Sequence, residues 1–191
     1  KMELGVALTD MIVGTVASFT PSKGLHHFLQ AACKIRNRLP GVRFVIAGDG
    51  SLRPQLEMLI KQFQLQDAVM LLGWRRDIPD LLKTFDVFLL TTVWEGLPRV
   101  LVEAALTGVP IVASNVDGVP EITRDRENGF LVTPGETNEM ADRIVYLLGD
   151  QSLRTTMGQR GRTIAESFSL EKMLSDYSAL YIDLVANPVR A

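Results

Sequence analysis

The sequence predicts an α/β fold in which an open parallel sheet of about six strands carries helices on both faces and is followed by a helical C-terminal tail. Short apolar runs of strand length alternate with longer stretches whose apolar residues recur at helical spacing. Each strand candidate is nearly continuously apolar, as expected for strands that are covered on both faces. This alternation favours a parallel sheet with right-handed crossovers.

The strands are predicted from short runs rich in Val, Ile, Leu and Phe. In chain order they cover residues 11–18, 42–48, 68–73, 86–92, 110–114 and 129–132. Between them, apolar residues at helical spacing predict helices at 25–35, 52–63, 78–85 and 97–107, and a helical turn at 118–123. Pro40 and Gly41 end the first of these helices.

Only helical patterns remain after Pro134. They predict helices at 136–148, 152–166 and 170–185, and Ser169 is a suitable N-cap for the last one. Because no further strand follows, we expect this tail either to cover the edge of the sheet or to reach toward a partner domain.

Length and charge limit the classes of function. The chain has 191 residues, enough for one large domain with a substantial core. Hydrophobic residues make up 47% and charged residues 22%, which excludes a disordered chain. The net charge of −2 gives no strong field toward nucleic acid or a membrane, so we expect no nucleic-acid partner.

Cysteine and histidine are scarce. Cys33 is the single cysteine, which excludes an internal disulfide, and the only histidines are the adjacent His26 and His27. A zinc cluster is therefore disfavoured, and we predict no metal cofactor. The chain has no apolar run of membrane-spanning length and does not open with a signal peptide, so we expect a cytoplasmic location.

The segment from Trp94 to Pro110 has unusual chemistry for the start of a helix. Pro98 suits a first helical turn, whose free N–H groups and positive dipole end form an anion site with phosphate as its usual guest. Glu103 is the only charge between Arg99 and the end of this helix. It either pairs with Arg99, worth about 0.3–0.5 kcal/mol, or is a partly buried carboxylate that accepts hydrogen bonds from ligand hydroxyls.

Other candidate residues follow the first and third strands, where ligands of open parallel sheets bind near the switch in strand order. Lys23 either pairs with a phosphate or is solvated. Trp74 either receives a flat base or packs over the neighbouring helix, and Arg75 belongs to a cluster that more often forms a solvated face or a local ion pair. The turn 48–50 matches the dinucleotide-binding pattern only weakly, and the chain lacks a P-loop motif.

Glu95 and Glu103, separated by seven residues, resemble the E-x7-E motif of retaining nucleotide-sugar glycosyltransferases with the GT-B fold, family 4 (group 1) in particular. Further segments resemble that family's C-terminal domain in the same order, and the likeness extends over residues 5–169. They are VGTVASFTPSKG, FVIAGDGSLRPQLE, LLGWRRDIPDLL, EGLPRVLVEA, GVPIVAS, GVPEI and NGFLVTPG.

The resemblance implies two catalytic candidates and a donor site. Glu95 would contact hydroxyls of the donor sugar, and Lys23 would neutralise the diphosphate and support its departure. Glu103 would hold the ribose. The remaining donor-binding candidates are the base-binding Gly73, Trp74 and Arg75, the helix-start residues Gly96, Leu97 and Pro98, which would bring amides to the diphosphate, and Ser18 and Arg99.

Ser18 is a departure from the family pattern, which commonly has an arginine five residues before the lysine. A phosphate-binding cation is therefore missing from its usual place. We hypothesise that Arg99 or Arg75 assists Lys23 instead.

The resemblance also implies that the chain is a fragment, the donor-binding half of a two-domain enzyme. Residues 1–10 would be a remnant of the inter-domain linker, 11–168 the Rossmann-like nucleotide-sugar-binding domain, and 169–191 a helix packing toward the missing N-terminal domain. Alone the fragment should bind a nucleotide sugar without efficient transfer. The missing domain would hold most acceptor contacts and any peripheral association with a membrane.

Two other functions stay open at this point. A GT-B sugar-nucleotide epimerase would use the same sheet, and a non-catalytic nucleotide-sugar-binding domain is favoured slightly by Ser18. The transferase is expected to act by same-face substitution, without a covalent enzyme intermediate.

Overall fold

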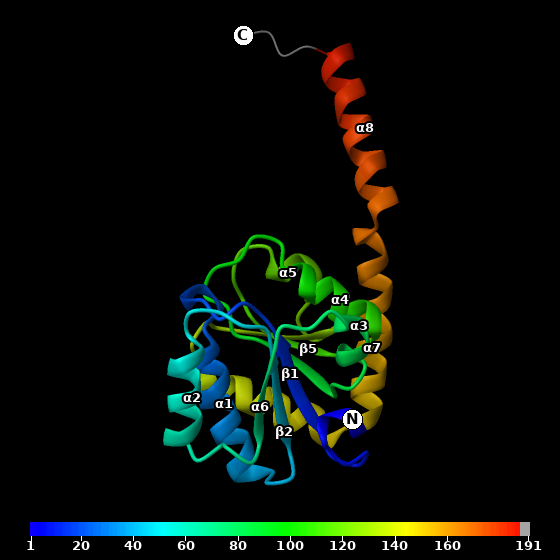
Figure 1. Cartoon of the computed structure of the whole chain (residues 1–191). Coiled ribbons are helices and arrows are strands. Elements are labelled where there is room, and N and C mark those ends of the chain that lie inside the picture. The colour runs from blue at the N-terminus through cyan, green and yellow to red at the C-terminus, as the bar shows by residue number, and fades with distance from the viewer. Residues whose placement is uncertain (188–191) are drawn as a thin grey trace.

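A six-stranded, fully parallel sheet forms the centre of the computed structural model, which describes residues 1–187 (Figure 1). The strand order is β3-β2-β1-β4-β5-β6, so the direction of winding reverses between β1 and β4. All six predicted strands are confirmed. They are β1 (Ile12–Val16), β2 (Arg43–Ala47), β3 (Val69–Gly73), β4 (Val87–Leu90), β5 (Ile111–Ser114) and β6 (Gly129–Val132).

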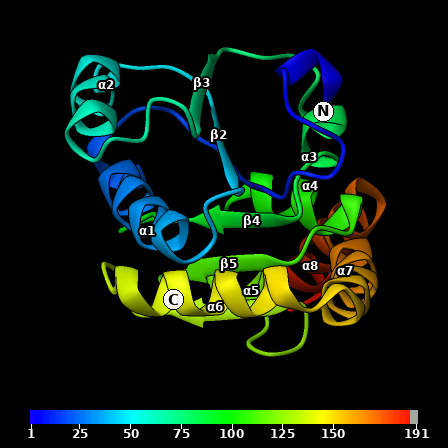
Figure 2. The same cartoon turned by 90° about the horizontal axis from the view of Figure 1, so that it is seen from below.

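Helices cover both faces of the sheet, as predicted. Figure 2 shows α1 and α2 on one side of the strands and α3, α4 and α7 on the other. The first face is covered by α1 (Leu25–Arg38), α2 (Arg53–Gln62) and α6 (Thr137–Gly149). The second is covered by α3 (Ile78–Leu82), α4 (Arg99–Thr107), α5 (Val119–Ile122) and α7 (Gln151–Ala165).

Neighbouring residues of each strand enter opposite halves of the core. Val13 and Phe44 pack in the cluster that contains α1, whereas Ile12 and Val45 pack in the cluster that contains α4. Successive side chains of a strand point to opposite faces, and both faces are buried here. This explains why the strand sequences are continuously apolar instead of alternating.

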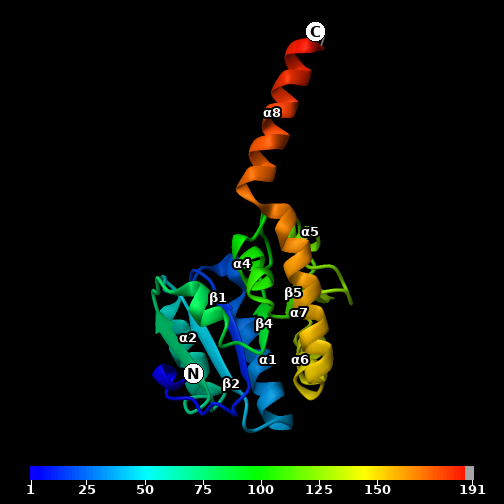
Figure 3. The ribbon, with the colours of Figure 1, turned by 90° about the vertical axis from the view of Figure 1, so that its right-hand side faces the viewer.

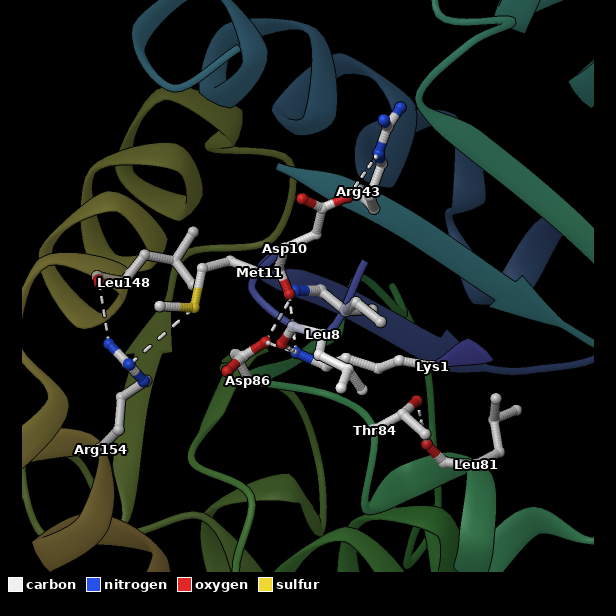
Figure 4. A network of polar contacts seen from close by, with 11 residues as sticks. Lys1, Leu8, Asp10, Met11, Arg43, Leu81, Thr84, Asp86, Leu148 and Arg154 are labelled. Atoms are coloured by element: carbon white, nitrogen blue, oxygen red, sulfur yellow. Dashed lines mark hydrogen bonds and ion pairs between the residues drawn. The ribbon is translucent and has the colours of Figure 1, made fainter. Parts of the chain in front are cut away.

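The N-terminal segment packs against the same body. Val6 is buried, and Met2–Leu4 forms a short 3₁₀ turn. The Lys1 ammonium donates to the carbonyl oxygen of Asp10 at 2.7 Å and lies 3.4 Å from the carboxylate of Asp86 (Figure 4). The segment predicted as a linker remnant is thus held to the start of β1 by several polar contacts.

The last helix, α8 (Leu170–Ala186), projects away from the sheet (Figures 1 and 3). Ser169 is its N-cap, as predicted, and the Ser169 hydroxyl accepts from the Lys172 N–H at 3.1 Å. None of its residues is buried, and the exposed apolar side chains include Leu170, Met173, Leu174, Tyr177, Leu180 and Tyr181. Positions 188–191 of the predicted C-terminal segment lie outside the described residues. Within residues 1–187, no helix is both long and apolar enough to cross a bilayer.

Helix α7 packs on α4 through a direct backbone contact. A Cβ added at Gly158 would lie 2.0 Å from the carbonyl oxygen of Gly108, which follows α4. At Gly161, one turn further along α7, an added Cβ would meet Ala105 only at 3.6–3.7 Å, an ordinary contact.

We therefore predict opposite effects for two alanine substitutions in this helix. Gly158→Ala should destabilise the chain by about 1–3 kcal/mol because the backbone of α4 must move. Gly161→Ala should be neutral or stabilise by up to about 1 kcal/mol, because alanine favours a helix over glycine. Urea unfolding midpoints of the two variants measure this difference, and equal midpoints would contradict the packing described here.

Candidate functional site

The loops that follow β1 and β4 meet where the strand order reverses. Such a switch point is the usual ligand crevice of an open parallel sheet. Lys23 comes from the first loop and Glu95 from the second, 72 residues later, and their side chains form an ion pair. Only 23% of the Lys23 side chain and 17% of the Glu95 side chain are exposed. The fold thus brings the two sequence-predicted catalytic candidates into direct contact.

Backbone contacts hold these two loops together. The Val93 N–H donates to the carbonyl oxygen of Ser22 at 2.9 Å, and the Thr91 hydroxyl donates to that of Lys23 at 3.1 Å. Gly24 adopts a φ of 58°, and an added Cβ would lie 2.2 Å from the Thr91 carbonyl oxygen. Glycine is therefore required for this close approach.

A third loop, between β5 and α5, supports the Glu95 segment. The Asp117 carboxylate accepts from the Glu95 N–H at 2.8 Å, and the Gly118 N–H donates to the carbonyl oxygen of Gly96 at 3.1 Å. Sequence reasoning does not single out Asp117. Its Asp-Gly dipeptide indicates only a turn, and the contact with Glu95 arises from the tertiary fold.

Helix α4 begins at Arg99, two residues later than the predicted start at Leu97. Pro98 is its N-cap and has an extended backbone, so the prediction that it lies in the first helical turn is wrong by one position. Proline has no N–H, so Pro98 presents no amide. The first amides of the helix are those of Arg99 and Val100, which have no hydrogen-bond partner among the described residues.

Glu103 is half-buried on α4. The simpler interpretation, an ion pair with Arg99, is not observed within residues 1–187, and Glu103 accepts no hydrogen bond from any of them. Arg99 is exposed. A half-buried carboxylate in this position is available to hydroxyl groups of a ligand.

A pocket of about 350 Å³ lies at the ends of β1, β2 and β3. It brings together three sequence-predicted residues, and it is lined by Val16, Ala17, Ser18, Gly48, Asp49, Trp74, Arg75 and Ile78. Trp74 is 78% exposed as a residue, so the alternative that it packs over a helix is wrong. Gly73, with a φ of 71°, ends β3 directly before the pocket.

Arg75 is engaged locally. Its Nε donates to the Asp77 carboxylate at 2.8 Å, and a second guanidinium nitrogen pairs with the other carboxylate oxygen. This hydrogen bonding lowers the pKa of Asp77 below its ordinary value and raises the pKa of Arg75. The local ion pair was one of the two predicted alternatives, and it means that Arg75 reaches a phosphate only by leaving or sharing Asp77.

A series of hydroxyl groups connects the pocket with the ion pair. The Ser18 and Thr20 hydroxyl oxygens are 3.4 Å apart, and those of Thr20 and Ser22 are 3.2 Å apart. Ser22 directly precedes Lys23. The loop after β1 therefore offers neutral hydrogen-bonding groups from the pocket to the lysine.

A second, apolar pocket of about 390 Å³ lies between Leu97 and the start of α8. Leu97 lines it together with residues at the start of α8, namely Ser167, Phe168, Ser169, Lys172, Met173, Asp176, Tyr177 and Leu180. Leu97 thus borders this apolar groove.

Comparison with known proteins decides the family. The family model described as glycosyl transferases group 1 matches residues 2–164. The chain belongs to this family. Membership confirms the group 1 resemblance inferred from the ordered motifs.

The chain resembles relatives with named activities. The chain is 33% identical to the UDP-Gal:alpha-D-GlcNAc-diphosphoundecaprenol alpha-1,3-galactosyltransferase of Escherichia coli, over 96% of the chain and 48% of that enzyme. It is 31% identical to the N-acetyl-alpha-D-glucosaminyl L-malate synthase of Bacillus anthracis, over 97% and 49%. The chain therefore spans about half the length of these relatives.

Solved structures show the same architecture as this chain. Anabaena Alr3699/HepE in complex with UDP superposes with a TM-score of 0.88 at 31% identity, over 96% of this chain and 51% of that one. The C-terminal domain of the group 1 protein LpcC from Francisella tularensis superposes with a TM-score of 0.79 at 24% identity, over 87% and 89%. The second match shows the fold alone.

Proposed function

We propose that this chain is the donor-binding part of a retaining family 4 glycosyltransferase that moves a sugar from a nucleoside diphosphate sugar to an acceptor hydroxyl. The observation that carries this proposal is the Lys23–Glu95 ion pair at the switch point, beside the free amides at the start of α4. The names of the relatives support it, since the Escherichia coli enzyme uses UDP-Gal and HepE was solved with UDP and with UDP-glucose.

Lys23 and Glu95 have complementary roles in this proposal. A diphosphate placed between Lys23 and the amides of Arg99 and Val100 would take the ammonium as its counterion. Glu95 would then be released from Lys23 and accept hydrogen bonds from the sugar hydroxyls. Lys23 would also stabilise the charge that develops on the departing diphosphate.

The rest of the donor would extend along the loop after β1. The base would lie in the pocket at Trp74, next to the backbone of Gly73, and the ribose would donate its hydroxyl hydrogen bonds to Glu103. The hydroxyl groups of Ser18 and Thr20 lie between the pocket and Lys23.

We propose same-face substitution as the chemical route. The acceptor oxygen would bond to the anomeric carbon as the bond from that carbon to the diphosphate oxygen breaks, and the acceptor proton would pass to the leaving phosphate. Glu95 would then act by holding the sugar and not as a covalent nucleophile. The described residues contain no group of three or more His, Cys, Asp or Glu side chains placed to hold a metal ion, and independence from metal stays a prediction.

The partner of this domain is proposed to be an N-terminal GT-B domain in the same full-length protein, because the chain spans about half of its relatives. The exposed apolar side chains of α8 would pack toward that domain. Association with a membrane through that domain stays a prediction. We also propose the cytoplasm as the compartment. The second candidate function is a non-catalytic nucleotide-sugar-binding domain, because Ser18 stands where the family pattern commonly has an arginine.

Calorimetric titration of the chain with UDP, GDP and ADP, and then with their sugars, tests the proposal. Lys23→Ala should weaken the best nucleotide by about 10–100-fold, because a charge-assisted hydrogen bond is worth about 1.5–3 kcal/mol. Glu103→Ala should weaken it by about tenfold through the ribose. Binding should survive EDTA.

Lys61→Ala is the matched control, because Lys61 is exposed on α2, away from the switch point. It should bind as the unchanged chain does. An affinity that Lys23→Ala leaves unchanged would contradict the proposed site. A loss of binding on chelation would contradict its independence from metal.

Arg99 is predicted to compensate for the serine at position 18. It is exposed at the first residue of α4 and forms no ion pair within residues 1–187, so its guanidinium is available to a phosphate. Arg99→Ala should weaken UDP binding by roughly 3–10-fold, measured in the same titration, while Arg160→Ala on the exposed surface of α7 should not. An unchanged affinity in Arg99→Ala, together with the weakened binding expected of Lys23→Ala, would show that Arg99 does not compensate.

A further inference from the structure

The loop between β5 and α5 holds two consecutive residues of the segment that carries Glu95. The Asp117 carboxylate accepts from the Glu95 N–H at 2.8 Å. The Gly118 N–H donates to the Gly96 carbonyl oxygen at 3.1 Å, and an added Cβ at Gly118 would lie 2.4 Å from that oxygen. The second contact therefore requires glycine at position 118.

This support matters because the Glu95 segment has no regular secondary structure. Residues 91–98 form neither helix nor strand, and Gly96 follows Glu95 directly. The position of Glu95 thus depends on tertiary hydrogen bonds. Lys23 holds its side chain, and Asp117 is the hydrogen-bond partner of its backbone N–H.

Asp117 adopts a backbone conformation that is unusual for a residue with a side chain. Its φ is 42°, and the only other described non-glycine residues with a positive φ are Gln64 and Arg126. Aspartate and asparagine enter this region more readily than most residues, but glycine does so without strain. The conformation alone therefore favours glycine at position 117, and the carboxylate adds the hydrogen bond to Glu95.

We propose that Asp117 is a positioning residue that fixes Glu95 for recognition of the donor sugar, an inference that rests on the function proposed above. Glu95 is the group assigned to the sugar hydroxyls, whereas the base and diphosphate contact other residues. Displacement of Glu95 should therefore weaken binding of a nucleotide sugar more than binding of the nucleotide alone. Asp117 in this way sets the preference for the intact donor over its nucleotide product.

The test compares two substitutions that separate the hydrogen bond from the backbone strain. Asp117→Gly relieves the strain and removes the acceptor, whereas Asp117→Asn keeps an acceptor oxygen and tolerates the positive φ. Gln64→Gly is the control, since it relieves a positive φ of 55° at the end of α2, away from the site. Each variant is titrated with UDP and with the best-bound of UDP-glucose, UDP-galactose and UDP-N-acetylglucosamine, and each is melted thermally.

We expect Asp117→Gly to lose about 3–10-fold in affinity for the nucleotide sugar, as for one hydrogen bond, with UDP affinity and melting temperature unchanged or raised. Asp117→Asn should restore the preference for the sugar, and Gln64→Gly should leave it unaltered. Equal losses for UDP and its sugar, or a lowered melting temperature that accounts for the loss, would show a merely structural role. If Asp117→Gly still prefers the nucleotide sugar over UDP as the unchanged chain does, this inference is wrong but the proposed function stands. If the unchanged chain binds no nucleotide, both the inference and the proposed function are wrong.

Discussion

A close backbone contact across the reversal in strand order determines the geometry of the whole site. Gly24 lies against the Thr91 carbonyl oxygen, where an added Cβ would be only 2.2 Å away. Because the two loops approach this closely, the Ser22 carbonyl oxygen accepts a hydrogen bond from the Val93 N–H at 2.9 Å. Lys23 and Glu95, the neighbours of these contacts, are then placed within reach of each other although 72 residues separate them.

The charges around this contact are largely paired within the protein. Lys23 pairs with Glu95 and Arg75 with Asp77, and the Asp49 carboxylate lies 3.3 Å from Arg53. A dianionic ligand must therefore displace Glu95 to pair with Lys23, whereas Arg99 forms no ion pair within residues 1–187. Attraction between partly buried charges is stronger than in bulk water, so the exchange favours a ligand that also offers Glu95 new hydrogen bonds. A nucleotide sugar meets that requirement, and a free nucleotide does not.

Most of the fold is predictable from the sequence, because strands buried on both faces leave continuous apolar runs and the helices between them leave regular stripes. The same pattern of strands and helices predicts the loops at the carboxyl ends of the strands, and these loops contain Lys23 and Glu95. Contacts made between loops are not predictable in this way. The support of Glu95 by Asp117 and the exposed position of Trp74 depend on tertiary packing, which leaves no local pattern in the sequence.

The proposed function requires that a nucleoside diphosphate binds across the loops at the switch point. Backbone amide spectra of the ¹⁵N-labelled chain, recorded while UDP is added, test it most directly. We predict that the largest shifts occur in residues 18–24, 73–75 and 95–100, which belong to three separate loops of one site. Shifts confined to the apolar groove between Leu97 and α8, or to the opposite edge of the sheet, would contradict it.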